Sequence, residues 1–203
     1  MEFVKEFATF LHQKGIIRFG DFTLASGKNS SYYVDLRIMP SFPHQFRYMI
    51  KHLQNMISED IGLDNFDAIA SVPTGGLVIA SVLAFETVKP LVYVRSQVKS
   101  YGTGKLVEGI VTEGMKILVI DDVATTGGSV INGIKELKKA GADVSDAYVI
   151  VNRLEGAQES LEQENVRLHH ILDILNVAKI LNESKLIDES VLENVKKQVS
   201  VKF

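Results

Sequence analysis

MKILVIDDVATTGGSV, residues 115–130, is the stretch of sequence that decides the fold of this chain. Its apolar run at 117–120 is typical of a strand that is buried on both faces. The run ends at two carboxylates, Asp121 and Asp122. The small residues that follow are Thr125, Thr126, Gly127, Gly128 and Ser129. Apolar residues then recur at helical spacing over 131–137, so the stretch predicts a strand, an acidic turn, a small-residue loop and a helix.

This combination of residues suits a sugar phosphate. Glycines leave backbone N–H groups accessible beside the hydroxyls, and the start of the following helix carries the positive end of its dipole, so a phosphate is favoured there. Asp121 and Asp122 suit the hydroxyl groups of a sugar, or a magnesium ion. The local pattern leaves two alternatives open, namely a solvated acidic loop and an ordinary Gly-Gly turn.

A glycine-rich stretch further upstream, at residues 99–107, fails to match two other phosphate-binding motifs. Residues 102–105, GTGK, resemble the end of a nucleotide-triphosphate loop. However, Leu106 stands where that motif requires Ser or Thr, and Lys99 stands where it requires its first glycine. Val107 replaces the last glycine of the dinucleotide-binding pattern. ATP-loop and Rossmann interpretations are therefore poor.

Composition places the chain among ordinary globular proteins. It has 203 residues, 46% of them apolar, and a net charge of −3, which predicts one compact domain with some elaboration. That charge argues against a nucleic-acid partner, for which a basic face is expected. The absence of cysteine excludes disulfides, a thiol nucleophile and a cysteine zinc site. Neither a signal-peptide layout nor an apolar run of membrane-spanning length is present, so we expect a cytoplasmic location and no membrane partner.

The hydrophobic pattern predicts an α/β fold with a central parallel sheet flanked by helices. Strands are predicted at 68–72, 91–94, 115–120, 147–151 and 166–171. Helices are predicted at 2–14, 46–57, 76–86, 129–140 and 177–203. Residues 16–43 predict short strands and turns that form a partly β layer before the sheet. Because strands alternate with helices, ligands are expected at the carboxyl ends of the strands.

Two further segments have the composition of anion sites. Residues 71–76, SVPTGG, form a second strand–loop–helix turn with backbone amides at a helix start, for which an ordinary tight turn is the alternative. The loop at 96–109 is too long for an idle connection, and its glycines and cations suit motion and an anionic leaving group. A flexible surface loop is the alternative there.

Residues 117–129 resemble the signature with which type I phosphoribosyltransferases bind 5-phosphoribosyl-1-pyrophosphate (PRPP). Three other stretches narrow the resemblance to the orotate phosphoribosyltransferase family. Residues 22–37, FTLASGKNSSYYVDLR, are similar to the hood segment that lies over the pyrimidine in that family, and residues 95–109, RSQVKSYGTGKLVEG, to its mobile catalytic loop. Residues 151–153, VNR, stand where the family has Asp-Arg after a strand. The match runs from about residue 15 to residue 175.

This resemblance implies the type I phosphoribosyltransferase fold with a small N-terminal hood. It divides the chain into an N-terminal helix and hood (1–60), an α/β PRPP-binding core (61–175) and a C-terminal helical segment (176–203). The implied reaction transfers the 5-phosphoribosyl group of PRPP to orotate, which gives orotidine 5′-monophosphate and pyrophosphate in UMP biosynthesis. Mg²⁺ is the implied cofactor, held mainly by PRPP. In the family the mobile loop covers the neighbouring subunit's site, which implies a homodimer with shared active sites.

Carried over position by position, the resemblance assigns roles to individual residues. Catalytic roles fall on Lys99, Arg95, Asp121 and Asp122. Binding of PRPP is assigned to Thr74, Gly75, Gly76, Arg95, Lys99, Tyr101, Lys105, Asp121, Asp122, Val123, Ala124, Thr125, Thr126, Gly127, Gly128 and Ser129. Binding of orotate is assigned to Lys28, Tyr33, Val34, Thr125 and Arg153. Arginine is apt for orotate because its planar fork suits a carboxylate.

Four positions depart from the family pattern. Ala25 stands where several members carry a lysine that reaches the substrate, and Lys28 is the candidate replacement. Ser96 replaces a second loop cation, Tyr101 replaces a histidine, and Asn152 replaces the aspartate beside the arginine.

Two alternative functions remain. A phosphoribosyltransferase for a purine or another base would share the PRPP loop, but the 22–37 string argues against it. A PRPP-sensing regulator on the same fold should lack the loop cations and carry a basic surface or a further domain. His169 and His170 lie outside these motifs, and we predict that they are structural.

Overall fold

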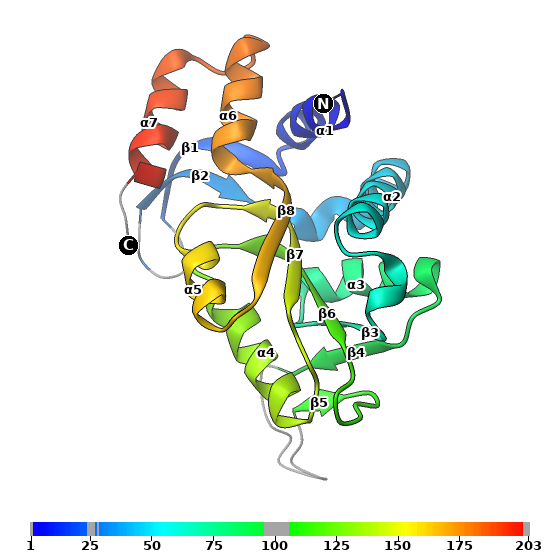
Figure 1. The fold of residues 1–203 in the computed structure, drawn as a ribbon. Helices are drawn as coiled ribbons and strands as arrows, with labels where there is room; N and C mark the ends of the chain where they lie inside the picture. The colour runs from blue at the N-terminus through cyan, green and yellow to red at the C-terminus, as the bar shows by residue number, and fades with distance from the viewer. Residues whose placement is uncertain (1, 24–26, 28, 96–105, 201–203) are drawn as a thin grey trace.

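A computed structural model describes residues 2–23, 27, 29–95 and 106–200 and is built around one six-stranded sheet (Figure 1). The strand order is β5-β4-β3-β6-β7-β8. The parallel strands are β3 (Ala68–Ser71), β4 (Leu91–Val94), β6 (Ile117–Ala124), β7 (Asp146–Asn152) and β8 (Arg167–Asp173). The predicted parallel sheet is thus confirmed, with one correction at its edge. Two residues predicted as loop form β5 (Val107–Glu108), which pairs antiparallel with β4.

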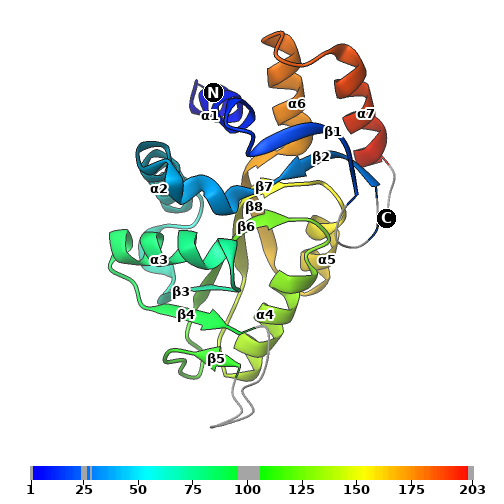
Figure 2. The ribbon, with the colours of Figure 1, turned by 180° about the vertical axis from the view of Figure 1, so that it is seen from behind.

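Helices cover both faces of the sheet (Figures 1 and 2). One face shares its core with α1 (Glu2–Gln13), α2 (Pro43–Asp60), α3 (Gly75–Thr87), α6 (Ile174–Glu183) and α7 (Glu189–Ser200). The other face packs against α4 (Gly128–Lys139) and α5 (Ala157–Gln163). None of the described helices is long and apolar enough to cross a membrane.

The predicted N-terminal β layer is a hairpin. Strands β1 (Ile17–Thr23) and β2 (Asn29–Val34) pair antiparallel, outside the main sheet. The β2 residue Tyr32 donates a hydrogen bond from its hydroxyl to the backbone oxygen of Arg153, which directly follows β7. The hairpin therefore lies over the carboxyl end of the sheet, where the sequence places the ligands.

The acidic turn predicted at Asp121 and Asp122 is wrong, because both residues belong to β6. Pairing with β7 continues past them, with Asp121 opposite Val149 and Ala124 opposite Asn152. The strand therefore carries the carboxylates to the edge of the sheet as part of its ladder.

Helical predictions hold with two differences. The C-terminal segment is helical as predicted and consists of two helices, but the first starts before residue 177, at Ile174, where the carboxylate of Asp173 accepts a hydrogen bond from the N–H of Asn176. Helix α5 was not predicted, and neither were the 3-10 turns η1 (Leu36–Ser41) and η2 (Leu63–Asn65).

Candidate functional site

The two predicted anion turns meet at the carboxyl edge of the sheet. Strands β3 and β6 are hydrogen-bonded neighbours, with Ser71 opposite Ile120 near their ends. After β3 the chain passes through Thr74 and enters α3 at Gly75. The start of α3 therefore lies beside the two carboxylates that β6 presents.

Glycine is required at the start of α3 because the helix touches the acidic pair. A Cβ added to Gly76 would lie 2.7 Å from the Cα of Asp121, and a Cβ on Gly75 would overlap the carboxylate of Asp122. Side-chain carbons do not approach so closely. The two glycines thus place the positive end of a helix dipole against two carboxyl groups.

Burial and repulsion within the acidic pair oppose the ionisation of Asp121. Asp121 is only 8% exposed, and its Oδ1 accepts a hydrogen bond of 2.9 Å from the N–H of Asp122. Burial, followed by the charge of Asp122, raises the pKa of Asp121 to about 8. Burial and the neighbouring charge therefore favour the protonated form of this carboxyl, and a cation or hydroxyl donors placed here would favour its ionised form.

The small-residue loop has the geometry of an anion site. Gly127 adopts a left-handed conformation with φ of 81° directly before α4, which begins at Gly128. Among the described residues no side chain caps α4, so its first N–H groups are available to a ligand. Thr126 and Ser129 are exposed around this helix start.

At the other end of the site, Arg153 follows β7 and lies beneath the hairpin. Its Nη2 is 2.8 Å from Oε1 of Glu155 and donates to Oγ of Ser30 at 3.3 Å. Its Cζ lies 4.9 Å from the ring centroid of Tyr32. The Arg153 side chain is buried and is held in its ion pair with Glu155. The structure thus places Arg153 at the predicted base end. Its contact with orotate stays a prediction.

Tyr33 and Val34, predicted to contact orotate, lie half-buried on β2. Cζ of Arg18 is 5.0 Å from the ring centroid of Tyr33. The hydroxyl of Tyr33 accepts from Nη2 of Arg37 at 3.4 Å, and the Arg37 guanidinium forms a two-point pair with Asp35 at 2.7 and 2.8 Å.

Arg37 is a site residue that the sequence-based assignment missed. Hydrogen bonds to Asp35, with a smaller contribution from the charge of Asp122, raise the pKa of Arg37, so it stays charged. Arg37 also lines a small cavity of about 70 Å³ together with Thr74 and Gly75. It therefore links the hairpin region to the turn before α3. The Asp-x-Arg at the end of the quoted hood string was the available signal.

Several predicted residues lie outside the described residues, namely Lys28, Lys99, Tyr101 and Lys105, together with the departures at Ala25 and Ser96. Arg95 is described: its N–H donates to the oxygen of Leu106 at 2.9 Å, and its Nη1 is 3.7 Å from Oε1 of Glu108. Asn152, which replaces the family's aspartate, accepts a hydrogen bond of 2.9 Å from the N–H of Leu154. The amide oxygen thus supports the turn that carries Arg153.

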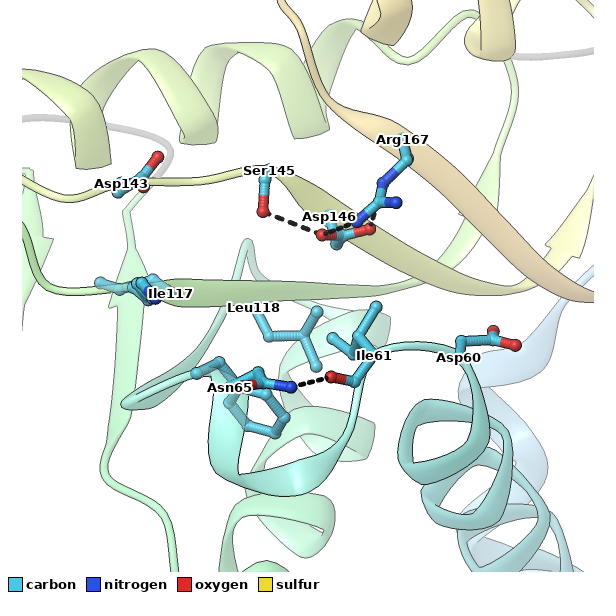
Figure 3. A pocket seen from close by; sticks show the side chains of 11 residues that line it. Asp60, Ile61, Asn65, Ile117, Leu118, Asp143, Ser145, Asp146 and Arg167 are labelled. Atoms are coloured by element: carbon cyan, nitrogen blue, oxygen red, sulfur yellow. Dashed lines mark hydrogen bonds and ion pairs between the residues drawn. The ribbon is translucent and has the colours of Figure 1, made fainter.

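A cavity of about 490 Å³ lies at the opposite edge of the sheet, by the amino ends of β6, β7 and β8 (Figure 3). Two of its charged residues pair with each other, since Asp146 accepts a hydrogen bond from Arg167 at 2.9 Å and a further one from Ser145 at 2.8 Å. His169 is 2.8 Å from the same carboxylate and stacks on Tyr148. These contacts connect β7 with β8 and do not form a reactive cluster. They support the structural role predicted for His169.

Comparison with known proteins agrees with this geometry. Residues 44–174 match the phosphoribosyl transferase domain. The orotate phosphoribosyltransferase of Cenarchaeum symbiosum is 54% identical over 179 residues, which cover 88% of this chain and 90% of that protein. The chain belongs to the orotate phosphoribosyltransferase family. The orotate phosphoribosyltransferase of Sulfolobus acidocaldarius is 42% identical over 203 residues, covering 98% of this chain and 95% of that protein.

Solved structures share the fold of this chain. The crystal structure of orotate phosphoribosyltransferase from Aeropyrum pernix has a TM-score of 0.76 at 36% identity, covering 89% of this chain and 99% of that chain. The structure of Leishmania donovani UMP synthase has a TM-score of 0.83 at 28% identity, covering 96% of this chain and 42% of that chain.

The predicted base end of the site also uses segments that lie outside the matched domain. The β1–β2 hairpin precedes residue 44, and α7 follows residue 174. Both nevertheless contact the segment just after β7, through Tyr32 to Glu155 and through Gln198 to Glu155. Glu155 and Gln198 therefore also lie at the candidate site, and the motifs did not reveal them.

Proposed function

We propose that this protein transfers the 5-phosphoribosyl group from PRPP to orotate, with formation of orotidine 5′-monophosphate and pyrophosphate. The observation that carries the proposal is the contact between the start of α3 and the acidic pair of β6. Since adjacent strands lie about 4.8 Å apart, two anion turns on β3 and β6 suit one ligand that carries a phosphate at one end and a diphosphate at the other.

The arrangement suggests where each part of the substrates binds. The 5′-phosphate would accept hydrogen bonds from residues 125–129 and the first N–H groups of α4. Asp121 and Asp122 would accept hydrogen bonds from the ribose hydroxyls, and the turn at 74–76 would hold the pyrophosphate. Orotate would then lie toward the hairpin and Arg153.

The donor set fits a magnesium ion that is held mainly by PRPP. Among the described residues no group of three or more His, Cys, Asp or Glu side chains could hold a metal. Mg²⁺ commonly binds through one or two carboxylates together with substrate phosphates, and Asp121 and Asp122 supply such carboxylates. When bound, Mg²⁺ would neutralise charge on the diphosphate.

Charge handling, rather than activation of a nucleophile, is the task of the protein residues. The ribosyl group should pass through an oxocarbenium-like transition state as the pyrophosphate departs. Arg95 and Lys99 would stabilise the developing negative charge of that leaving group. The loop that carries Lys99 would also exclude water, which could otherwise capture the ribosyl cation.

We also propose a homodimer with shared active sites, for which α3 offers an interface. A helix that is apolar all round is normally buried, and α3 buries Ile79 and Leu83 against the sheet. On its other side, however, Val78, Phe85 and Val88 are 40%, 82% and 90% exposed. A second copy that packed against Val78 would lie next to the pyrophosphate turn, because Val78 lines the small cavity shared with Thr74 and Gly75.

A direct assay tests the proposed reaction. Purified protein is mixed with Mg²⁺, PRPP and orotate, and the loss of orotate absorbance is followed with and without PRPP. An Asp121→Asn, Asp122→Asn double variant serves as the inactive control. Consumption of adenine or hypoxanthine in place of orotate would favour a purine phosphoribosyltransferase. Binding of PRPP without turnover of any base would favour a regulator on this fold.

A further inference from the structure

Gln198 on α7 uses its whole side-chain amide to connect three segments. Its Oε1 accepts hydrogen bonds from the N–H and the hydroxyl of Ser31, at 2.7 and 2.8 Å. Its Nε2 donates to Oγ of Ser30 at 3.1 Å and to Oε1 of Glu155 at 3.3 Å. One side chain thus joins the C-terminal helix, strand β2 and the segment after β7.

Glu155 is the common acceptor of this cluster. Its Oε1 accepts from the hydroxyl of Tyr32 at 2.7 Å and from Nε of Arg153 at 3.0 Å, besides the contact with Gln198. Burial and the neighbouring Glu155 raise the pKa of Tyr32, so the phenol remains a donor. The side chains of Arg153 and Glu155 are each less than 10% exposed. Ser30, Tyr32, Arg153 and Glu155 are buried, so a hydrogen bond lost among them cannot be replaced freely by water.

The cluster fixes the part of β2 that leads to the predicted base contacts. Tyr33 and Val34 follow Ser31 and Tyr32 directly on the strand. Ser31 is held by Gln198 through its backbone N–H, while Ser30 is shared between Gln198 and the guanidinium of Arg153. The distance between β2 and Arg153 thus depends on a residue of a distant helix.

We propose that Gln198 is a positioning residue for the base end of the site. It sets β2 and Arg153 at the separation that a planar, carboxylate-bearing pyrimidine requires, and it does so without touching the ribose phosphate end. This inference rests on the proposed function. A residue that merely attached α7 to the protein would affect overall stability and both substrates alike.

The first test separates the two substrates. Gln198→Ala is compared with Asn194→Ala, an exposed position on the same helix. Gln198→Ala removes four part-buried hydrogen bonds, one of them to the carboxylate of Glu155, so the KM for orotate should rise roughly tenfold. The KM for PRPP and the values for Asn194→Ala should stay near those of the wild type. An unchanged KM for orotate, or an equal rise for both substrates, would overturn the proposal.

The second test uses charge. Gln198→Glu places a carboxylate beside Glu155 and should raise the KM for orotate further than Gln198→Ala. Adding Glu155→Gln restores a donor–acceptor pair and the original total charge, and should recover part of the loss. Absence of any recovery in the double variant would contradict the assigned contact.

Hydrogen exchange provides a readout that does not depend on turnover. The N–H of Ser31 should lose protection in Gln198→Ala and keep it in Asn194→Ala. If the wild-type protein consumed no orotate while this exchange pattern held, the proposed reaction would fail and the structural link would stand. If orotate were consumed while exchange and KM were unaffected by Gln198→Ala, the positioning role alone would fail.

Discussion

Gly76 at the start of α3 touches Asp121 on β6, since a Cβ at Gly76 would lie 2.7 Å from the Cα of that aspartate and 2.7 Å from Oγ of Ser71. This contact joins the predicted pyrophosphate turn to the predicted ribose site. It also makes the approach of helix to strand the most sterically restricted point of the site.

Gly76→Ala should destabilise the protein although alanine is the better helix former. The added methyl group overlaps β6, and overpacking commonly costs about 1–3 kcal/mol. We expect a lower denaturant midpoint and an affinity for PRPP reduced at least about tenfold, measured by titration calorimetry. Gly128→Ala is the stability control, because its Cβ would be 3.8 Å from the nearest atom, Oγ1 of Thr126. A Gly76→Ala protein as stable as the wild type would show that α3 and β6 are not so close.

The raised pKa of Asp121 predicts stability that falls as pH rises. The folded-state pKa is about 8 and the ordinary value is 3.8, so between them only the folded state holds the proton. The resulting stabilisation is complete below about pH 4 and is lost as pH rises through about 8. Asp121→Asn should remove this slope and raise the free energy of unfolding at pH 8 by roughly 1 kcal/mol or more.

The same variant should use PRPP poorly, because an amide cannot replace a carboxylate toward ribose hydroxyls and a cation. Denaturant unfolding between pH 5 and pH 9 measures the predicted pH dependence of stability, with exposed Asp143→Asn as the control. A pH slope that persists in Asp121→Asn would assign the proton to another group.

Lys99→Ala should bind PRPP normally and turn over slowly. Loss of one group that stabilises a developing charge commonly lowers kcat by about 10²- to 10³-fold. Lys99→Arg, which keeps the charge, should retain much more of the rate. Single-turnover kinetics with saturating PRPP measure the step, and a normal rate for Lys99→Ala would remove this residue from the mechanism.

Phe85→Glu should weaken the proposed dimer, because it places a charge in the exposed apolar face of α3. Light scattering after size exclusion should give the mass of two chains for the wild type and of one chain for this variant. Leu186→Glu, at a half-exposed apolar position between α6 and α7, is the control and should leave the mass unchanged. A wild-type protein with the mass of one chain would contradict the dimer.

Sharing of active sites predicts complementation between two inactive variants. When Lys99→Ala is mixed and refolded with the Asp121→Asn, Asp122→Asn protein, half of the dimers are mixed and each contains one intact site. Activity should return to about a quarter of that of the wild type. A mixture as inactive as its components would show that each chain completes its own site.

Asp146→Asn should lower stability and leave the turnover of folded enzyme unchanged, since Asp146 lies at the sheet edge opposite the proposed site. Although burial opposes its ionisation, hydrogen bonds from Arg167, His169 and Ser145 lower the pKa of Asp146. Its stabilisation is therefore present above the ordinary value of 3.8 and is lost as pH falls through the lower folded-state pKa. We expect a loss of about 1–3 kcal/mol at pH 7, measured by denaturant unfolding. A large loss of activity would instead indicate that this edge takes part in function.

Local signals predicted the units that position the PRPP end. The strand–glycine–helix pattern at 68–86 and its counterpart at 117–137 each contain their own strand, turn and helix start, so neither requires knowledge of distant partners. The extension of β6 through Asp121 was not predictable in this way, because acidic residues disfavour strands and the ladder with β7 decides the outcome. Helix α5 was missed for a related reason: it buries only Ala157 and Leu161, too few to produce a helical period.

The base end depended on contacts between distant segments, and the sequence predicted it only in part. Motif resemblance located Arg153, but its ion pair with Glu155 and its cover by Tyr32 follow from packing of the hairpin on the sheet. Gln198 is separated from Ser31 by 167 positions, and a single polar residue in an amphipathic helix gives no sign of its partner. Arg37 was predictable only in part. Its Asp-x-Arg pattern is visible in the sequence, but its proximity to Asp122 is not.

The bonds of Gln198 have a consequence for biosynthesis. On the ribosome, α7 emerges after every other described element. Until then, Ser31 and Glu155 lack their hydrogen bonds to Gln198. A nascent chain could thus assemble its PRPP turns early while its pocket for the base stayed unfinished. Discrimination between bases would then be acquired later than phosphate binding, once α7 has been made.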